Sequence, residues 1–153
     1  MARVLDQGAE IGEELFEAIE LLVFGAIGLT SFAVAQSSLA ELTLHQWRAL
    51  VVIGRAGPIR VGEVALQIGT ALSATSRLLS RLERRGYLTS ARDEKDRRAT
   101  NVQLTPLGEQ VRVAVIDRRR QLMQEALSHR QGPLPKDLAR GLHALGKAFA
   151  PYT

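Results

Sequence analysis

Apolar positions in the middle of the chain recur at the three- and four-residue spacing of helices that bury one face. Two short segments of this kind have their apolar positions at Val64, Ala65, Ile68, Leu78, Leu79 and Leu82. Gly69 can supply the turn between them, and Ser73 is a suitable N-cap for the second helix. Gly86 follows a basic last turn, as a glycine placed after a helix end does. The pattern therefore predicts a helix-turn-helix.

The pattern changes to strand-like alternation after Gly86. Residues 87–89 and 101–104 are short runs rich in strand formers. The loop between them, residues 92–100, carries many charges of both signs. A helix-turn-helix followed by a charged two-stranded hairpin predicts a winged helix, and we expect that lobe to span residues 43–105.

A long apolar segment precedes this lobe, from Glu10 to about Gln36. Between residues 21 and 35 it is apolar nearly all round, interrupted only by Thr30 and Ser31. A helix with this pattern needs cover on more than one side, and a second subunit is a natural source of it. The apolar run is shorter than the roughly 20 residues that cross a bilayer. We therefore expect an interface helix and no membrane span.

Local signals mark the ends of the remaining helices. Thr43, with Gln46 three residues later, has the pattern of a capping box, and the Gly-Pro pair at 57–58 ends that helix. The Thr-Pro pair at 105–106 opens a further helix, with threonine as N-cap and proline at the first helical position. A last helix is expected over residues 136–149.

Charge is distributed unevenly along the 153 residues. The net charge is −6 over residues 1–42, +6 over residues 43–100 and +4 over residues 101–153, which leaves the chain at +4. A positive field centred on a helix-turn-helix is what binding to DNA phosphates requires. A solvated, arginine-rich helix surface is the alternative explanation.

Several kinds of chemistry have no support in the sequence. The chain has no cysteine, which excludes disulfides, thiolate metal sites and thiol redox sensing. No serine lies in a Gly-x-Ser-x-Gly turn, and no glycine-rich phosphate loop is present. The three histidines are scattered without metal-ligand spacing. We therefore expect no enzyme, no cofactor and no metal site.

The same segments resemble the MarR family (multiple-antibiotic-resistance regulators) of bacterial transcription factors. The resemblance rests on LTLHQWRAL at 42–50, VA at 64–65, SATSRL at 73–78, LERRGYL at 82–88, DEKDRRA at 93–99 and LTPLG at 104–108. It implies one MarR-type domain over residues 1–153, mainly α-helical with a small β-hairpin wing. Within it, residues 10–36 and 106–150 would form a helical dimerisation lobe beside the winged helix-turn-helix.

The second helix of the helix-turn-helix supplies most of the candidate DNA contacts. A recognition helix places its N-terminal residues against base edges in the major groove, so we predict groove contacts from Ser73, Thr75, Ser76 and Arg77. Thr75 lies near the boundary of the exposed face. Arg81 and Arg84, farther along the helix, are predicted to hold phosphates.

The wing supplies the remaining candidates, Lys95, Asp96, Arg97 and Arg98. Three acids in this loop indicate that some of them pair with arginines or cap the turn. The family resemblance implies an Asp-x-Arg in which the aspartate braces the wing and the arginine enters the minor groove. Asp96 and Arg98 match that spacing, and Arg97 is the rival for the tip.

The resemblance also implies a function. The chain would be a cytoplasmic homodimer that binds double-stranded DNA at a pseudo-palindromic operator, acting as a repressor that responds to a small aromatic or anionic effector. His45, Trp47 and Arg48 could line the effector pocket, although a core anchor between the first helix and the DNA-binding lobe is the preferred role for Trp47. The alternative function is a winged-helix interaction or RNA-binding module without an operator.

Overall fold

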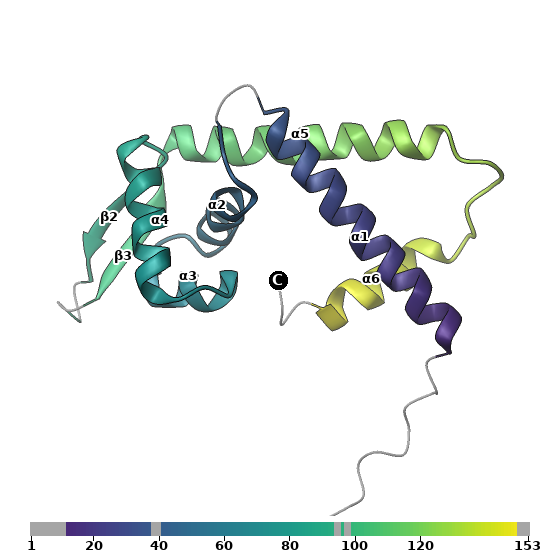
Figure 1. The fold of residues 1–153 in the computed structure, drawn as a ribbon, viewed down its shortest axis with the longest axis horizontal. Coiled ribbons are helices and arrows are strands. Elements are labelled where there is room, and N and C mark those ends of the chain that lie inside the picture. The colour runs from purple at the N-terminus through teal and green to yellow at the C-terminus, as the bar shows by residue number, and fades with distance from the viewer. Residues whose placement is uncertain (1–11, 38–40, 94–95, 97–98, 150–153) are drawn as a thin grey trace, which may run out of the picture.

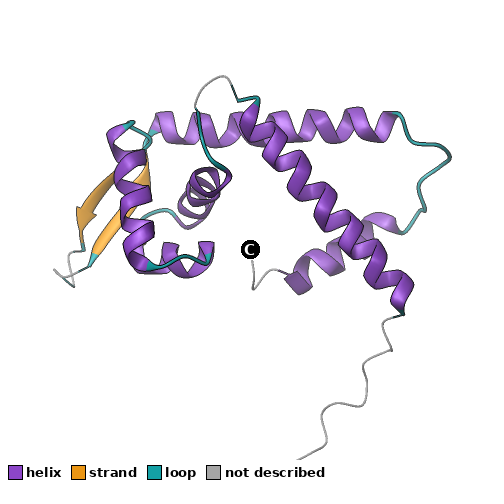
Figure 2. Cartoon of the chain, in the orientation of Figure 1, coloured by secondary structure: helices purple, strands orange, loops and turns teal. Residues whose placement is uncertain are grey.

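The computed structural model describes residues 12–37, 41–93, 96 and 99–149, and in these it is mainly helical with one small sheet (Figures 1 and 2). The predicted fold class is confirmed. The helices are α1 (Glu13–Ala35), α2 (Leu44–Ala56), α3 (Val61–Ile68), α4 (Leu72–Arg84), α5 (Pro106–Ser128) and α6 (Leu138–Phe149). The strands are β1 (Ile59–Arg60), β2 (Leu88–Arg92) and β3 (Thr100–Leu104).

The lobe built from α2, α3, α4 and the sheet has its own hydrophobic core. The largest fully buried side chains in it include Leu50, Ile53, Leu82 and Leu88. Gly69 and Gly86 adopt positive φ angles of 69° and 76°, so the turn before α4 and the end of α4 both use left-handed backbone, as predicted. This core fixes α4 against α3 and the sheet.

The sheet has one strand more than the sequence predicted. β3 pairs antiparallel with β2 on one side, as expected for the hairpin, and with the two-residue strand β1 on the other. Ile59 lies opposite Val102 in that extra pairing. A strand of two residues has no period of its own, which is why the pattern of apolar positions could not reveal it.

The long helix α5 connects the winged lobe to the other helices (Figure 1). Thr105 caps it by accepting a hydrogen bond from the Gly108 backbone N–H at 3.0 Å, and Pro106 occupies the first turn, as predicted. Gly108 packs against the backbone of Tyr87, the residue before β2. A Cβ on Gly108 would lie 1.9 Å from the Tyr87 carbonyl oxygen. Only glycine therefore permits α5 to approach the start of β2 in this way.

A second, smaller core joins α1, α2 and α5. It contains Ala33 and Val34 from the end of α1, Trp47 from α2, and Val115 and Leu122 from α5. Trp47 is buried there, which confirms the prediction that it is a core anchor between the first helix and the winged lobe. The predicted capping box is also present, since the Thr43 and Gln46 side chains each bond the other residue's backbone N–H.

Two helix starts differ from the sequence prediction. α4 begins at Leu72 with Ala71 as its N-cap, so Ser73 is not the cap. The Thr75 backbone N–H donates to the Ala71 carbonyl at 2.9 Å, which starts the helix before Ser73. α6 begins at Leu138 rather than at Lys136.

Candidate nucleic-acid interface

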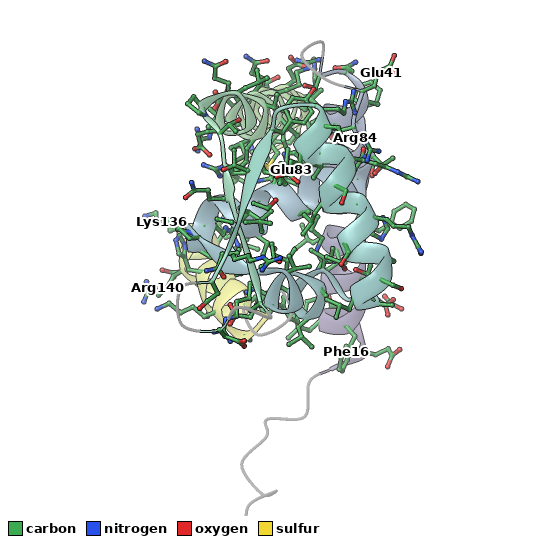
Figure 3. The ribbon with its side chains drawn as sticks, turned by 90° about the vertical axis from the view of Figure 1, so that its left-hand side faces the viewer. Phe16, Glu41, Glu83, Arg84, Lys136 and Arg140 are labelled. Atoms are coloured by element: carbon green, nitrogen blue, oxygen red, sulfur yellow. The ribbon has the colours of Figure 1, made fainter. Side chains whose placement is uncertain are left out.

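The outer face of α4 carries exposed hydroxyl and guanidinium groups. The side chains opposite, Leu79 and Leu82, are buried in the lobe, and this fixes which face of the helix points outward. The exposed set comprises Ser73, Ser76, Arg77, Arg81 and Arg84. Figure 3 shows Arg84 on this helix. The arrangement offers donors at several levels along one helix face, which suits both base edges and phosphates.

Thr75 does not belong to this face, and its predicted groove contact is wrong. Its side chain is fully buried, and its hydroxyl lies 2.6 Å from that of Thr70 and 3.2 Å from the Ala71 carbonyl oxygen. The hydroxyl is thus used inside the protein, where it holds the turn against the first turn of α4. We therefore exclude Thr75 from the residues that read bases.

Neighbouring polar groups hold α4 in place. The Glu83 carboxylate accepts hydrogen bonds from the Ser90 backbone N–H and hydroxyl, which ties α4 to β2 (Figure 3). Arg85 donates to the Glu41 carbonyl at 2.6 Å and stacks over the Tyr87 ring at 5.5 Å. Although Arg85 adjoins Arg84, its guanidinium is therefore occupied within the protein.

The base of the wing is organised around Asp93. One carboxylate oxygen accepts from the Arg60 guanidinium at 3.2 Å and from the Asn101 side-chain amide at 3.1 Å, and the other accepts from the Asp96 backbone N–H at 2.9 Å. The family resemblance implied Asp96 as a brace, and the sequence did not distinguish Asp93, whose partners come from β1 and β3, from the other wing acids. The predicted wing residues Lys95, Arg97 and Arg98 lie outside the described residues, and the Asp96 side chain is exposed.

A hollow of about 750 Å³ separates the start of α4 from the wing. Its walls include Arg60 of β1 and Val61 at the start of α3, Leu72 and Ser76 from α4, and Thr100 at the base of the wing. Figure 1 shows that the start of α4 and the tip-ward ends of β2 and β3 lie at the same end of the lobe. The first turn of α4, which is predicted to contact the major groove, and the wing thus face the same side of the molecule.

The three predicted effector residues have different surroundings. His45 is exposed, Trp47 is buried in the smaller core, and Arg48 donates to the Gln67 carbonyl at 3.1 Å, near the end of α3. The last contact assigns Arg48 a role in joining α2 to α3. The Trp47 Nε1–H finds no acceptor among the described residues.

Arg119 of α5 makes a contact in this region that sequence reasoning did not predict. Its guanidinium lies over the Trp47 ring at 5.5 Å. Burial lowers the pKa of Arg119, and the positive charges of Arg55 and Arg120 lower it further. Its neighbours in sequence have other partners: Arg118 bonds Gln36, and Arg120 pairs with Asp117. Arg119 pairs with no carboxylate of the described residues, so an uncompensated positive charge lies beside the aromatic core.

The helices outside the winged lobe expose a large apolar surface. Leu21, Phe24 and Ile27 of α1 are exposed, as are Leu142 and Phe149 of α6. α1 is long and apolar enough, by length and composition alone, to cross a membrane. The sequence pattern predicted that α1 is covered on more than one side. Among the described residues, most of α1 is exposed in the single chain.

The arrangement of α2, α3, α4 and the three-stranded sheet defines a winged helix-turn-helix protein. Residues 40–99 match the model of the MarR family. A curated relative, the uncharacterized HTH-type transcriptional regulator YfiV of Bacillus subtilis, is 35% identical over 65 residues, which are 42% of this chain and 41% of the relative. The match thus spans about two fifths of that relative's length.

Solved structures share the fold over almost the whole chain. Rv1404 from Mycobacterium tuberculosis has a TM-score of 0.77 and 24% identity, and the match covers 91% of this chain and 96% of that one. FabT from Streptococcus pneumoniae, solved in complex with DNA, has a TM-score of 0.70 and 17% identity, with 92% and 99% covered. The chain is thus similar to MarR-family regulators in the sequence of residues 40–99, and it shares its fold with these solved structures over almost its whole length.

Proposed function

We propose that this protein is a transcriptional regulator that binds double-stranded DNA sequence-specifically as a homodimer. The observation that carries the proposal is the exposed serine and arginine face of α4, which lies at the same side of the lobe as the wing. Ser73, Ser76 and Arg77 would meet base edges near the start of the helix. Arg81 and Arg84 would hold phosphates and fix the register without reading sequence.

The homodimer is supported by the uncovered apolar surface of α1 and α6. Phe24 in the middle of α1 is 80% exposed in the single chain, and Phe16 near the start of α1 is also exposed (Figure 3). Contiguous apolar surface of this kind marks interaction sites in soluble proteins. A two-fold arrangement would place two recognition helices about one DNA turn apart, facing a pseudo-palindromic operator.

A second copy explains α1 better than a bilayer does, and it agrees with a cytoplasmic protein that has no membrane contact. The first turns of α1 carry Glu13, Glu14, Glu17 and Glu20, which are all exposed. Carboxylates placed in the hydrocarbon region of a bilayer are costly in free energy. The other end of the helix packs through Ala33 and Val34 against the smaller core.

A small anionic or aromatic effector is proposed to act at the junction of the two lobes, where it would weaken DNA binding and relieve repression. The supporting observation is the Arg119 guanidinium over Trp47, with the positive charges of Arg55 and Arg120 nearby. An anion there would neutralise a charge that burial disfavours. Because Trp47 joins α1, α2 and α5, a ligand at this point could change how the lobes are oriented.

Selection of duplexes from a random DNA pool tests the main proposal. A regulator should enrich one pseudo-palindromic sequence and bind it with two protein chains per duplex, measured by sedimentation equilibrium. Enrichment of no sequence, or equal binding to RNA and random DNA, would contradict the proposal. It would instead support a winged-helix interaction or RNA-binding module.

A further inference from the structure

The recognition helix begins with an apolar side chain that the protein leaves uncovered. Leu72 is the first residue of α4 and is 58% exposed, whereas Leu79 and Leu82 on the same helix are buried. The side chain has no capping role, because the N-cap is Ala71 and no side chain caps this helix. Exposing a leucine forgoes the stabilisation that burial would give it. The folded chain therefore gains little from a leucine at this position.

The surroundings of Leu72 place it where the major groove would lie. It adjoins Ser73 and lines the hollow between α4 and the wing together with Ser76. The Ser76 hydroxyl donates to the Leu72 carbonyl at 2.9 Å, so the two residues share the first turn of α4. N-terminal residues of a recognition helix approach base edges. Of the groups that the major groove displays, the C5-methyl of a pyrimidine is the apolar one.

We propose that Leu72 is a specificity-determining residue that contacts the C5-methyl group of a pyrimidine in the major groove. The inference rests on the proposed function, since it requires α4 to enter that groove. The methyl group can come from thymine or from 5-methylcytosine, and both present the same apolar surface. Ser73 and Ser76 would supply polar contacts beside it. The first turn of α4 would then read both the apolar methyl group and the polar groups of the base edges.

The size of the effect follows from the burial of one methyl group. Covering a group of this size with an apolar side chain is worth ~0.8 kcal/mol, which is about a fourfold change in the dissociation constant. Thymine and uracil pair identically and differ at this position only in the methyl group. Replacing one thymine by deoxyuridine in a duplex therefore removes the proposed contact and leaves the hydrogen-bonding edges in place.

Leu66 provides a matched control on the neighbouring helix. It is 82% exposed and lines the same hollow, but it belongs to α3 rather than to the recognition helix. The substitutions Leu72→Ser and Leu66→Ser remove the same apolar side chain from two exposed positions. Thermal unfolding of both variants checks that neither change has disturbed the fold.

The experiment measures binding of the full chain to a duplex selected from a random pool. Each thymine of the half-site is replaced in turn by deoxyuridine, and a second series replaces the responsive thymine by cytosine or 5-methylcytosine. We expect one thymine whose replacement weakens binding of the wild type and of Leu66→Ser about fourfold. Binding of Leu72→Ser should not respond to that replacement. Recovery of affinity with 5-methylcytosine, but not with cytosine, would show that the methyl group itself is recognised.

Two results would overturn the inference. The first is a Leu72→Ser variant that keeps the methyl dependence of the wild type, and the second is a half-site in which no thymine shows that dependence. Either result would leave Leu72 free for contact with a protein instead. Failure of the pool to yield any preferred duplex is a different outcome, because it contradicts the proposed function together with the inference. The selection step therefore separates failure of the regulator assignment from failure of the methyl contact.

Discussion

The hydroxyl groups of Thr70 and Thr75 lie 2.6 Å apart and join the turn of the helix-turn-helix to its recognition helix. Thr75 is fully buried, so this hydrogen bond is shielded from water on the side of α4. Buried polar groups with partners specify geometry, and they are costly to leave unpaired. The orientation of α4 thus depends in part on a residue that looks, by sequence position, like a base reader.

Replacing Thr75 by valine tests this role. The change keeps the shape of the side chain but removes its bonds to Thr70 and to the Ala71 carbonyl. We expect a loss of ~1–3 kcal/mol in the free energy of unfolding, measured by urea denaturation. Ser73→Ala on the exposed face is the control and should change stability little. Unchanged stability with selective loss of operator binding would instead return Thr75 to the base-reading set.

Arg77 and Arg84 are predicted to affect DNA binding in different ways. Arg77→Ala should weaken the selected duplex more than a random one, by ~1–3 kcal/mol, because it removes a contact to a base. Arg84→Ala should weaken both duplexes alike and lower the slope of the salt dependence by about one, because it removes a phosphate contact. Anisotropy titrations at several salt concentrations measure both effects. Equal losses on both duplexes for Arg77→Ala would make it a phosphate clamp.

For the substitution of Asp93 we predict a change in DNA affinity opposite to the change expected from charge alone. Asp93→Ala removes a negative charge from a DNA-facing lobe, which by charge alone would strengthen binding. We expect weaker binding, because the carboxylate holds Arg60, Asn101 and the Asp96 backbone at the base of the wing. Glu63→Ala removes an exposed acid from α3 and is the matched control. Similar gains in affinity for both variants would show that Asp93 does not brace the wing.

The dimer is tested by charge placed on the apolar face of α1. Phe24→Glu should convert the protein to monomers, because it would bury a carboxylate in the proposed interface. Leu66→Glu introduces the same charge at an equally exposed apolar position in the winged lobe and should leave the dimer intact. Sedimentation velocity measures the outcome. Dimers in both variants would place the subunit contact elsewhere.

Local sequence rules predicted the parts of the fold that depend on near neighbours. The capping box at Thr43 and Gln46 and the Thr105–Pro106 helix start involve residues at most three positions apart, and both are present. The turn glycines and the burial of Leu79 and Leu82 follow from spacing in the same way.

The features that sequence reasoning missed depend on contacts between distant segments. Asp93 braces the wing through Arg60, which lies 33 positions away in the sequence. Arg119 meets Trp47 across two helices, and the pairing of β1 with β3 depends on the packing of the whole lobe. Thr75 was misassigned because it lies at the edge of the buried face, where the helical period alone does not decide exposure.

The most direct test of the central claim is an anisotropy titration of the purified protein. The probe is a duplex from upstream of its own gene, compared with a scrambled duplex of the same composition at two salt concentrations. We predict tight binding of two chains per duplex with a clear preference for the native sequence at both salts. Weak, steeply salt-dependent binding that is equal on the two duplexes would contradict a sequence-specific regulator.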